Sequence, residues 1–556
     1  MPTIRVVLIL ALLALPLAPA AADEDTAAAV DRFAACAEVR IAEIEVFVTD
    51  RRGAPVHGLT VDDFKLFENG DRVEIRNFYV VGGEAGETGN GPLAGAAPTL
   101  LIIYVDNVNL HPLNRSRFFK DLKDFLYSGM GKDVRVMLVT NDRFHRARLS
   151  WAGQGSLSVR QGFTDDPTRI SFALDELENL RGDRAYYDLE RQDILREISR
   201  AEDRDPIARW RIINRVKTYS ASIFNDVKFS VQALDDFVGS LTGLSGHKIL
   251  LYVSDGFPMR AGEDVHYVLK EKYGSQSVGM MSYAYDISRQ LEGLAEAANA
   301  NGVTFYALDT SGMAGQSSTA AASASGVLSS MIDTVERKNA QNPLLFMAKQ
   351  TGGRAMVDTT RTGQALDSVI SDFGNYYSLG YRREPGTDGE PADIKVKLRG
   401  RGLKLRYRRG VREVTAERRM EGAIRACLLY GYRNNPMGLR LDLGDVEPSG
   451  DGNRLVNCTV SIPHRELTFI PVGQGSESLV RLFIAVEDDR GVLSPVREVS
   501  VAVVGPSDGT PDGGEHRYEM RLLMAGGRQT LVVGALDDVS CLTSFATLQC
   551  DVRDAP

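Results

Sequence analysis

Leu100–Val105 reads LLIIYV and is followed directly by Asp106. Three later stretches repeat this pattern of an unbroken apolar run that ends in a polar residue: Val134–Val139 before Thr140, Ile249–Val253 before Ser254-Asp255-Gly256, and Val303–Leu308 before Asp309. Stretches with helical periodicity lie between the runs, at residues 115–127, 170–180, 226–244 and 287–301. Uniformly apolar strands that alternate with helices predict a doubly wound α/β domain whose mostly parallel sheet is covered on both faces.

The polar residues after these strands are the first candidates for a site. In open α/β sheets, ligands bind beyond the carboxyl ends of the strands. Asp106, Thr140, Asp255 and Asp309 all follow predicted strands. We therefore expect the functional face of the domain at this edge of the sheet.

Further segments flank this domain, which we place at residues 99–375 with insertions at 188–220 and 311–342. Residues 39–82 predict a small β unit, with a helical turn capped by Thr60 and a hairpin at Asn69-Gly70. Strands within residues 376–413 are candidates to complete that unit. From residue 415 to 556, short alternating segments separated by turns predict a β-sandwich.

The N-terminus has the pattern of a secretory signal. Arg5 precedes an apolar run, and small residues up to Ala22 offer cleavage sites. The run is too short for a typical spanning helix, although an N-terminal membrane anchor is the alternative. We predict a signal peptide at residues 1–22, a periplasmic or secreted mature protein, and no transmembrane segment in the mature chain.

Cysteine usage agrees with export. Four of the five cysteines lie in the last quarter of the chain, at positions 427, 458, 541 and 550, and the fifth is Cys36. In an oxidising compartment this clustering predicts one or two disulfides in the C-terminal domain. The spacing is not typical of a zinc site.

Charge and motifs exclude several classes of function. The formal net charge of −9 argues against a nucleic-acid partner, which requires a basic surface. The basic run at residues 395–412 is interpreted as the solvated face of strands, with Ile394 and Val396 directed inward. No HExxH and no phosphate-binding glycine loop is present, and the GxSxG match at residues 505–509 (GPSDG) falls in a predicted turn between strands, not in a nucleophile elbow between a strand and a helix. We therefore predict that the chain is not an enzyme.

Asp106 and the Ser254-Asp255-Gly256 triplet together resemble the von Willebrand factor A (VWA) domain, whose sheet carries a metal-ion-dependent adhesion site. The resemblance is closer to a bacterial exported subfamily. It covers residues 40–410 and rests on VFVTDRRGAPVHGLTVDDFKLFENGDRVEIRNFYV at 46–80 and YYSLGYRREPGTDGEPADIKVKLRGRGLKLRYRRG at 376–410. It implies a protein-interaction module, usually without catalysis.

The metal site departs from that family's pattern. Where the family has Asp-x-Ser-x-Ser, this chain reads Asp106-Asn107-Val108-Asn109-Leu110, and Arg184 stands where a threonine is expected. A hard cation wants about six oxygen ligands, so Asp106 and Asp255 are weak metal candidates. We predict no cofactor, with Arg184 as the counter-charge of the two aspartates. The alternative is Mg²⁺ or another divalent cation, held with help from the amide oxygens of Asn107 or Asn109.

The leading functional prediction is recognition of an unidentified protein or surface ligand. The predicted binding face contains Asp106, Asn107, Asn109, Arg184 and Asp255. The alternative is a structural or assembly component of an envelope or secretion system, with the C-terminal domain as its contact. A metal-dependent enzyme is the third interpretation.

Overall fold

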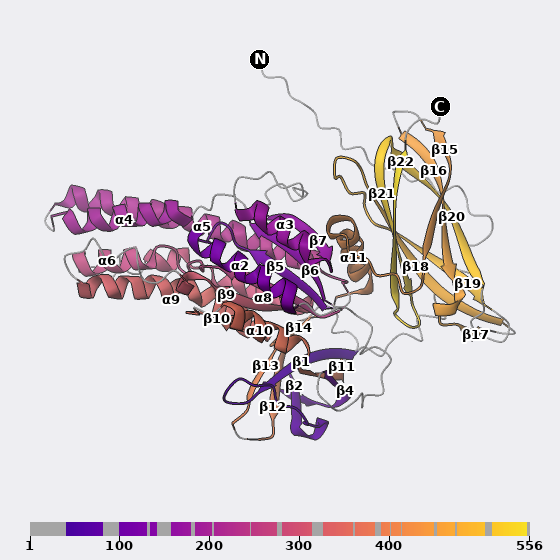
Figure 1. Cartoon of the computed structure of the whole chain (residues 1–556), viewed down its shortest axis with the longest axis horizontal. Helices are drawn as coiled ribbons and strands as arrows, with labels where there is room; N and C mark the ends of the chain where they lie inside the picture. The colour runs from indigo at the N-terminus through magenta and orange to yellow at the C-terminus, as the bar shows by residue number, and fades with distance from the viewer. Residues whose placement is uncertain are drawn as a thin grey trace, which may run out of the picture. The chain divides into compact units, whose positions relative to one another are not determined.

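The structure is a computed structural model of the 556-residue chain (Figure 1). It describes residues 41–81, 99–129, 134–141, 157–178, 184–202, 205–244, 246–274, 281–313, 326–359, 362–383, 391–400, 402–412, 414–449, 453–472, 475–505 and 514–552. The predicted signal peptide and Cys36 lie outside the described residues. Contacts divide the chain into two compact units, with Arg40–Thr415 in one and Ala416–Pro556 in the other.

A six-stranded sheet forms the centre of the first unit, in the order β10-β9-β8-β5-β6-β7. All neighbours pair in parallel except β7, which is antiparallel to β6. The strands are β5 (Thr99–Val105), β6 (Val134–Asn141), β7 (Leu157–Thr164), β8 (Lys248–Ser254), β9 (Val303–Asp309) and β10 (Ala355–Met356). The predicted class, a mixed α/β fold with a largely parallel sheet, is confirmed.

Helices cover both faces of this sheet, which explains why its central strands are apolar throughout. On one face, α2, α3 and α10 share a core with alternate residues such as Leu101, Ile103 and Val105. The intervening residues Leu100 and Ile102 are equally buried and face the opposite layer. That layer includes α8 and α9, which contact β9, and α5, which packs on α8. The bounds are α2 (Pro112–Gly129), α3 (Pro167–Glu178), α5 (Pro206–Ser240), α8 (Ser288–Ala300), α9 (Gly326–Thr351) and α10 (Thr362–Phe373).

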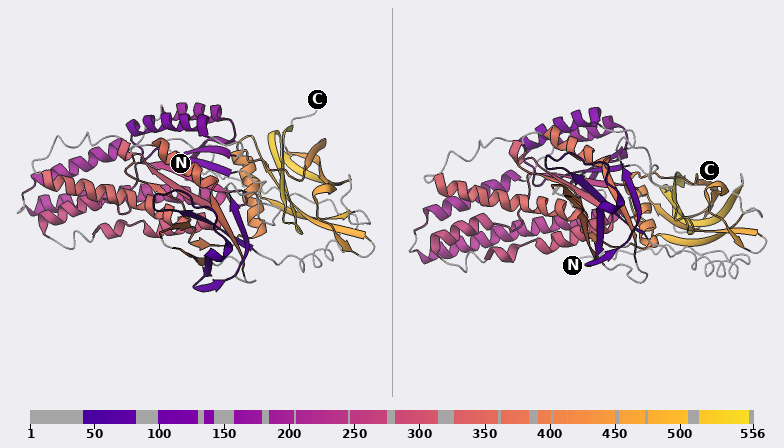
Figure 2. Two further views of the ribbon diagram at one scale, coloured as in Figure 1. Left: turned by 60° about the horizontal axis from the view of Figure 1, so that its bottom comes forward. Right: turned by 90° about the horizontal axis from the view of Figure 1, so that it is seen from below.

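Four helices extend together beyond the carboxyl ends of the strands (Figures 1 and 2). They are α4 (Arg184–Arg200), the first half of α5, α6 (Glu263–Tyr273) and the first half of α9. Asp205 caps α5 by accepting hydrogen bonds from the main-chain N–H groups of Ile207 and Ala208. The predicted insertion at 188–220 corresponds to α4 and the start of α5. Helix α9 runs without a break through Pro343, the residue after the end of the predicted insertion at 311–342.

Strands near the N-terminus of the described chain pair with strands far later in the sequence, as in Val81 of β4 opposite Tyr376 of β11. One antiparallel sheet has the order β13-β1-β11-β4 and a second has the order β14-β12-β2-β3. They enclose one core that includes Ile44, Leu66 and Leu379. The bounds are β1 (Ile41–Thr49), η1 (Val61–Asp63), β2 (Phe64–Glu68), β3 (Asp71–Val73), β4 (Ile75–Val81), β11 (Tyr376–Arg382), β12 (Ala392–Leu398), β13 (Lys404–Tyr407) and β14 (Gly410–Val411).

Two local predictions in this β unit are confirmed. Asn69 and Gly70 both have positive φ and join β2 to β3 in a tight hairpin. In β12, Lys395 and Lys397 are exposed while Val396 is buried.

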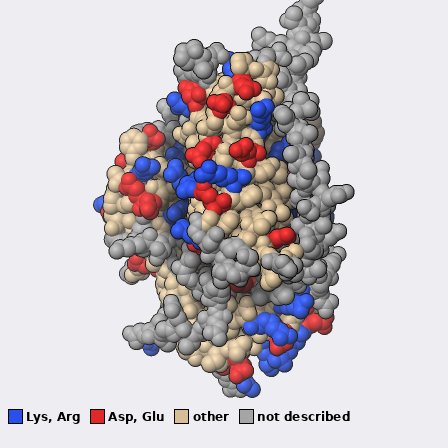
Figure 3. All heavy atoms as spheres, turned by 90° about the vertical axis from the view of Figure 1, so that its right-hand side faces the viewer, with Lys and Arg blue, Asp and Glu red and all other residues tan. Residues whose placement is uncertain are grey.

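On the face shown in Figure 3, acidic and basic side chains are interspersed over the described surface, and Lys and Arg gather in one patch low in the view.

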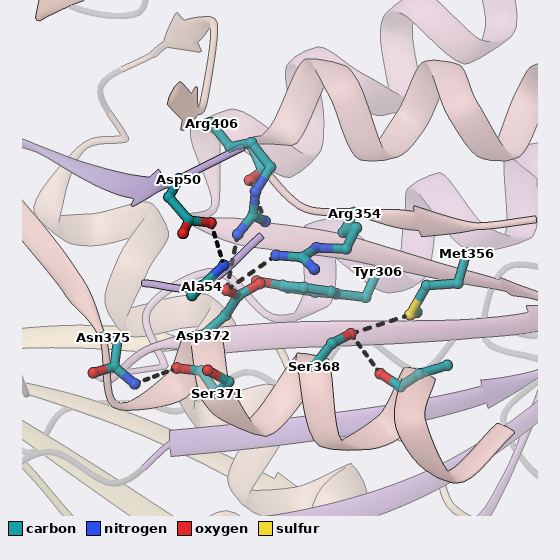
Figure 4. A network of polar contacts seen from close by, with 12 residues as sticks. Asp50, Ala54, Tyr306, Arg354, Met356, Ser368, Ser371, Asp372, Asn375 and Arg406 are labelled. Atoms are coloured by element: carbon teal, nitrogen blue, oxygen red, sulfur yellow. Dashed lines mark hydrogen bonds and ion pairs between the residues drawn. The ribbon is translucent and has the colours of Figure 1, made fainter. Parts of the chain in front are cut away.

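A buried polar network joins this β unit to the α/β domain. Figure 4 shows Tyr306 of β9, Arg354 and Arg406 of β13 directed at Asp372 of α10. The Tyr306 hydroxyl lies 2.9 Å from the Asp372 carboxylate, Arg406 Nη2 lies 2.8 Å from it and Arg354 Nη2 lies 3.6 Å from it. Only 3 % of Asp372 is exposed. Two cations and a hydroxyl therefore compensate one buried carboxylate.

The second unit consists of helix α11 (Ala416–Tyr430) and two antiparallel sheets. One sheet has the order β15-β16-β20, and the other has β17-β18-β21-β22 with β19 paired to β18. Residues of both sheets share one core, including Val460 and Leu482. The bounds are β15 (Arg440–Pro448), β16 (Asn453–Pro463), η4 (His464–Glu466), β17 (Ile470–Val472), β18 (Gly475–Glu487), β19 (Arg497–Gly505), β20 (Glu515–Ala525), β21 (Gly527–Asp537) and β22 (Thr543–Val552).

The prediction of disulfides in this unit does not agree with the structure. Cys427, Cys458, Cys541 and Cys550, the four cysteines among the described residues, are all free thiols. Cys427 is buried on α11, Cys458 lies in the core, and Cys541 is exposed. Cys458 lies close enough to Cys550 for the charge of one thiolate to affect the pKa of the other, but the two are not joined by a disulfide.

Candidate binding site

The site lies where the strand order of the central sheet reverses. From β5 the chain proceeds to β6 and β7 on one side, and it returns to β8, β9 and β10 on the other. The carboxyl ends of β5 and β8 therefore flank the topological switch point, where ligands of such sheets bind. Asp106 follows β5, and Asp255 follows β8. The structure thus brings together two of the predicted site residues.

Asp106 is fully buried and surrounded by neutral hydrogen-bond donors. Its carboxylate accepts hydrogen bonds from the Tyr252 hydroxyl at 2.6 Å, from Asn109 Nδ2 at 2.9 Å and from Ser254 Oγ at 3.1 Å. Burial raises the pKa of Asp106 and outweighs these hydrogen bonds, which lower it. The pKa of Tyr252 is also raised, by burial and by the charge of Asp106.

Asp255 is held in a similar way by donors from three segments. Asn114 Nδ2 donates to both carboxylate oxygens, at 3.0 and 2.9 Å. The main-chain N–H of His111 donates at 2.8 Å, and the Thr310 hydroxyl donates to the other side of the group. Only 7 % of Asp255 is exposed.

The remaining predicted residues differ in their positions. Asn107 is buried and accepts a hydrogen bond from Arg115 Nη1 at 2.6 Å, so its amide oxygen has a protein partner. Asn109 donates to Asp106 and borders a cavity. Arg184 begins α4, and its side chain lies outside the described residues. Pairing of Arg184 with either aspartate therefore stays a prediction.

The two carboxylates do not form a good cation site. Within the described part of the chain, no group of three or more His, Cys, Asp or Glu side chains could hold a metal ion. A hard cation would have to displace the N–H and O–H donors that surround Asp106 and Asp255, and Val108 and Leu110 offer no side-chain oxygen in exchange. The residues present therefore do not fit the ion that the VWA resemblance implies.

A cavity of about 60 Å³ opens beside Asn109. It lies between the loops after β5 and β8 and the four extending helices. Gly256 allows α9 to approach this closely, because a Cβ at its position would lie 2.4 Å from the main-chain oxygen of Ala340. The described residues that line the cavity include five with charged side chains, namely Asp188, Arg191, Asp226, Asp264 and Glu336.

Arg191 forms ion pairs with two of these carboxylates and with a third nearby. Its Nε lies 2.5 Å from the Asp264 carboxylate, and its Nη2 lies 3.4 Å from Glu336 and 3.6 Å from Asp333. Burial by itself would lower the pKa of Arg191, but Asp264 and Glu336 raise it. The sequence analysis missed this cluster. The available signal was the spacing of Tyr187, Asp188 and Arg191, which places all three on one face of a helix.

A serine and a histidine that were also missed lie behind the cavity. Ser220 Oγ is 3.1 Å from His266 Nε2, and both residues are at most 1 % exposed. His266 Nδ1 has no hydrogen-bond partner among the described residues. Burial lowers the pKa of His266 to about 4. The pair has neither the orienting acid nor the access that a hydrolytic dyad requires.

No family model and no curated protein matches this sequence. Solved structures are similar to it only at low identity. A β-glucuronidase from Bacteroides uniformis is 7% identical, covers 32% of this chain and 19% of its own, and has a TM-score of 0.16. A β-glucosidase from Listeria innocua is 9% identical, covers 86% of this chain and 48% of its own, and has a TM-score of 0.14. A Bordetella pertussis protein designated ApaA is 13% identical, covers 21% of this chain and 95% of its own, and has a TM-score of 0.15. TM-scores this low carry no argument about fold or function.

The described helices include none with the length and apolar character that a membrane crossing requires.

Proposed function

We propose that this chain is an exported recognition protein that binds a protein or surface ligand at the carboxyl-end face of its α/β domain, without a catalytic step. In this proposal the α/β domain is VWA-like with a degenerate metal site, and the sheets of the C-terminal unit form a β-sandwich. Export to the periplasm or beyond rests on the sequence of residues 1–22.

One observation carries the proposal. Asp106 and Asp255 lie at the switch point of the sheet, and protein donors surround both carboxylates. The two carboxylates lie at the edge of the sheet where ligands bind. Protein hydrogen-bond donors surround them, in the place that a metal ion has beside the carboxylates of a VWA domain. We infer that partner binding at this face is independent of divalent cations.

Site-specific photo-crosslinking tests the proposed face. A p-benzoylphenylalanine replaces Pro112, which is partly exposed at the start of α2 beside the switch point. The full mature chain is then irradiated with an envelope extract of the organism that encodes it. The expected result is one discrete adduct that unlabelled wild-type protein competes away and that EDTA leaves unchanged.

The matched control places the same photo-reactive group at Lys349. This residue is exposed near the end of α9, which runs back along the sheet toward the amino ends of the strands. Equal adducts from positions 112 and 349, or an adduct from 349 alone, would contradict the proposed face. Loss of the adduct in EDTA would contradict the metal-independent mode.

The assembly alternative needs a contact surface on the C-terminal unit. Among the described residues of that unit, the exposed large apolar side chains are Leu443, Val492 and Val504. They lie on β15, on the loop after β18 and on β19, respectively. An adduct that requires the C-terminal unit and not position 112 would favour this second function.

A further inference from the structure

The cavity beside Asn109 is negatively charged and partly aromatic. Among the described residues that line it, four carry a carboxyl group and one carries a guanidinium, so the described lining has three more negative than positive formal charges. The rings of Tyr187 and Tyr219 form part of the same lining. Carboxylates combined with aromatic faces are the surroundings that organic cations prefer in proteins.

The size of the cavity limits what it can hold. Its volume of about 60 Å³ is small beside the roughly 300–1,000 Å³ of sites for drug-sized ligands. It suits the end group of one long side chain. A bare metal ion is a poor occupant, because the described acidic side chains form no metal-binding group.

Arg191 provides a second, independent indication of a ligand. The residue is only 8 % exposed and lines the cavity, and its Nη2 has no hydrogen-bond acceptor among the described residues. The carboxylate oxygens nearest to Nη2 belong to Glu336 and Asp333, at 3.4 and 3.6 Å, which is within ion-pair distance but beyond that of an ordinary hydrogen bond. A buried N–H without an acceptor favours a ligand that also carries a carbonyl oxygen, as every residue of a peptide does.

Building on the proposed recognition function, we propose that this cavity receives the basic end of a lysine or arginine side chain of the partner. Asp188, Asp226 and Glu336 supply the counter-charge, and Arg191 Nη2 donates a hydrogen bond to a main-chain carbonyl oxygen of the same segment. This polarity is opposite to that of a metal-dependent adhesion site, where a bound cation would attract an acidic residue.

The probes are small and chemically matched. N-acetyl-arginine amide and N-acetyl-lysine amide carry the cation, and N-acetyl-citrulline amide is the neutral counterpart of the arginine probe. Each is titrated into the full mature chain at low salt while the methyl NMR signal of Ile223, which lines the cavity, is followed. Ile223→Val assigns that signal. A dissociation constant on the order of 1 mM is expected for at least one cationic probe.

Two variants make the test specific. Asp188→Asn together with Glu336→Gln removes two cavity charges at nearly constant volume and should weaken cation binding at least about five-fold. Glu190→Gln removes a charge from the same helix outside the cavity and should leave binding unchanged. No shift of the Ile223 signal with either cation, equal shifts with citrulline, or unchanged binding by the double variant would each overturn the proposal.

The outcome is separable from that of the proposed function. If the partner still crosslinks at position 112 and the arginine and lysine probes do not compete, the recognition function stands and the cationic pocket is wrong. If the probes bind and no partner crosslinks, the pocket stands and the proposed face is wrong.

Discussion

Tyr252 of β8 donates its hydroxyl hydrogen to Asp106 over 2.6 Å, at the carboxyl-end edge of the central sheet. The hydroxyl is buried and its ring stacks on Tyr104 of the neighbouring strand. A carboxylate that is already hydrogen-bonded in this way has little to gain from a cation. This pair therefore makes the site a fixed part of the fold.

Removal of that donor should destabilise the protein. Tyr252→Phe leaves Asp106 buried with fewer hydrogen bonds, and we expect a loss of about 1–3 kcal/mol in the free energy of unfolding. Urea unfolding measures the change. Tyr127→Phe, at a tyrosine that is 58% exposed, is the control and should have almost no effect. An effect of Tyr252→Phe as small as that of the control would show that the hydrogen bond contributes little.

The network around Asp372 should behave as a coupled unit (Figure 4). Arg406→Met removes the closer of the two described cations and should cost about 3 kcal/mol, because among the described residues Asp372 then keeps Arg354, at 3.6 Å, as its one cation. Asp372→Asn in the same chain should restore part of the loss. A double-mutant cycle by urea unfolding measures this coupling, and simple additivity of the two substitutions would contradict it.

Acid should weaken the join between β1 and the central sheet. Burial alone would raise the pKa of Glu45, but His247, 3.0 Å away, together with Arg408 and Lys248 lowers it to about 2. Because the folded pKa lies below the ordinary 4.5, the ionised Glu45 stabilises the fold above pH 4.5, and this contribution is lost as the pH falls toward 2. It amounts to about 3 kcal/mol at most.

The measurement is urea unfolding at several pH values between 6 and 2 for wild type and Glu45→Gln. The difference between the two proteins should shrink as the pH falls through this window. Glu296→Gln, at an exposed carboxyl on α8, is the control. A constant difference between wild type and Glu45→Gln at all pH values would exclude the assigned role.

The cysteines should react as thiols, in an order set by burial. Burial raises the pKa of Cys427 to about 12 and that of Cys458 to about 11, whereas Cys541 is exposed. Because the thiolate is the reactive form, an alkylating reagent without reductant should modify Cys541 in the native protein and the other two only after unfolding. Mass spectrometry identifies the sites. Protection of Cys427 or Cys458 in the unfolded, unreduced chain would instead indicate a disulfide.

The sequence predicted those parts of the fold in which one local pattern suffices. Continuous apolar runs identified β5, β6, β8 and β9, and Asn69-Gly70 identified a hairpin. The edge strand β7 was missed because its sequence LSVRQGFT is neither continuously apolar nor strictly alternating. Half-exposed positions at a sheet edge leave too weak a signal.

For the site, the sequence identified the strand ends but not the side chains that complete them. Asp106 and Asp255 were predicted because parallel strands end at one edge. Their donors Tyr252 and Thr310 sit at or just beyond the ends of strands, and strand periodicity cannot indicate which hydroxyl reaches which carboxylate. The cavity was not predicted, because side chains from two loops and four helices, spread from Val108 to Ala340, build it.

Thermal unfolding of residues 23–556 in EDTA, and then with Mg²⁺, Mn²⁺ or Ca²⁺, tests the central claim that protein donors satisfy Asp106 and Asp255 without an ion. The account predicts that neither wild type nor Asp255→Asn changes its own unfolding temperature between these conditions. An ion at a hundred times its dissociation constant would stabilise the fold by about 2.7 kcal/mol. A stabilisation of that size in the wild type that Asp255→Asn abolishes would contradict the account and show that the site still holds a metal.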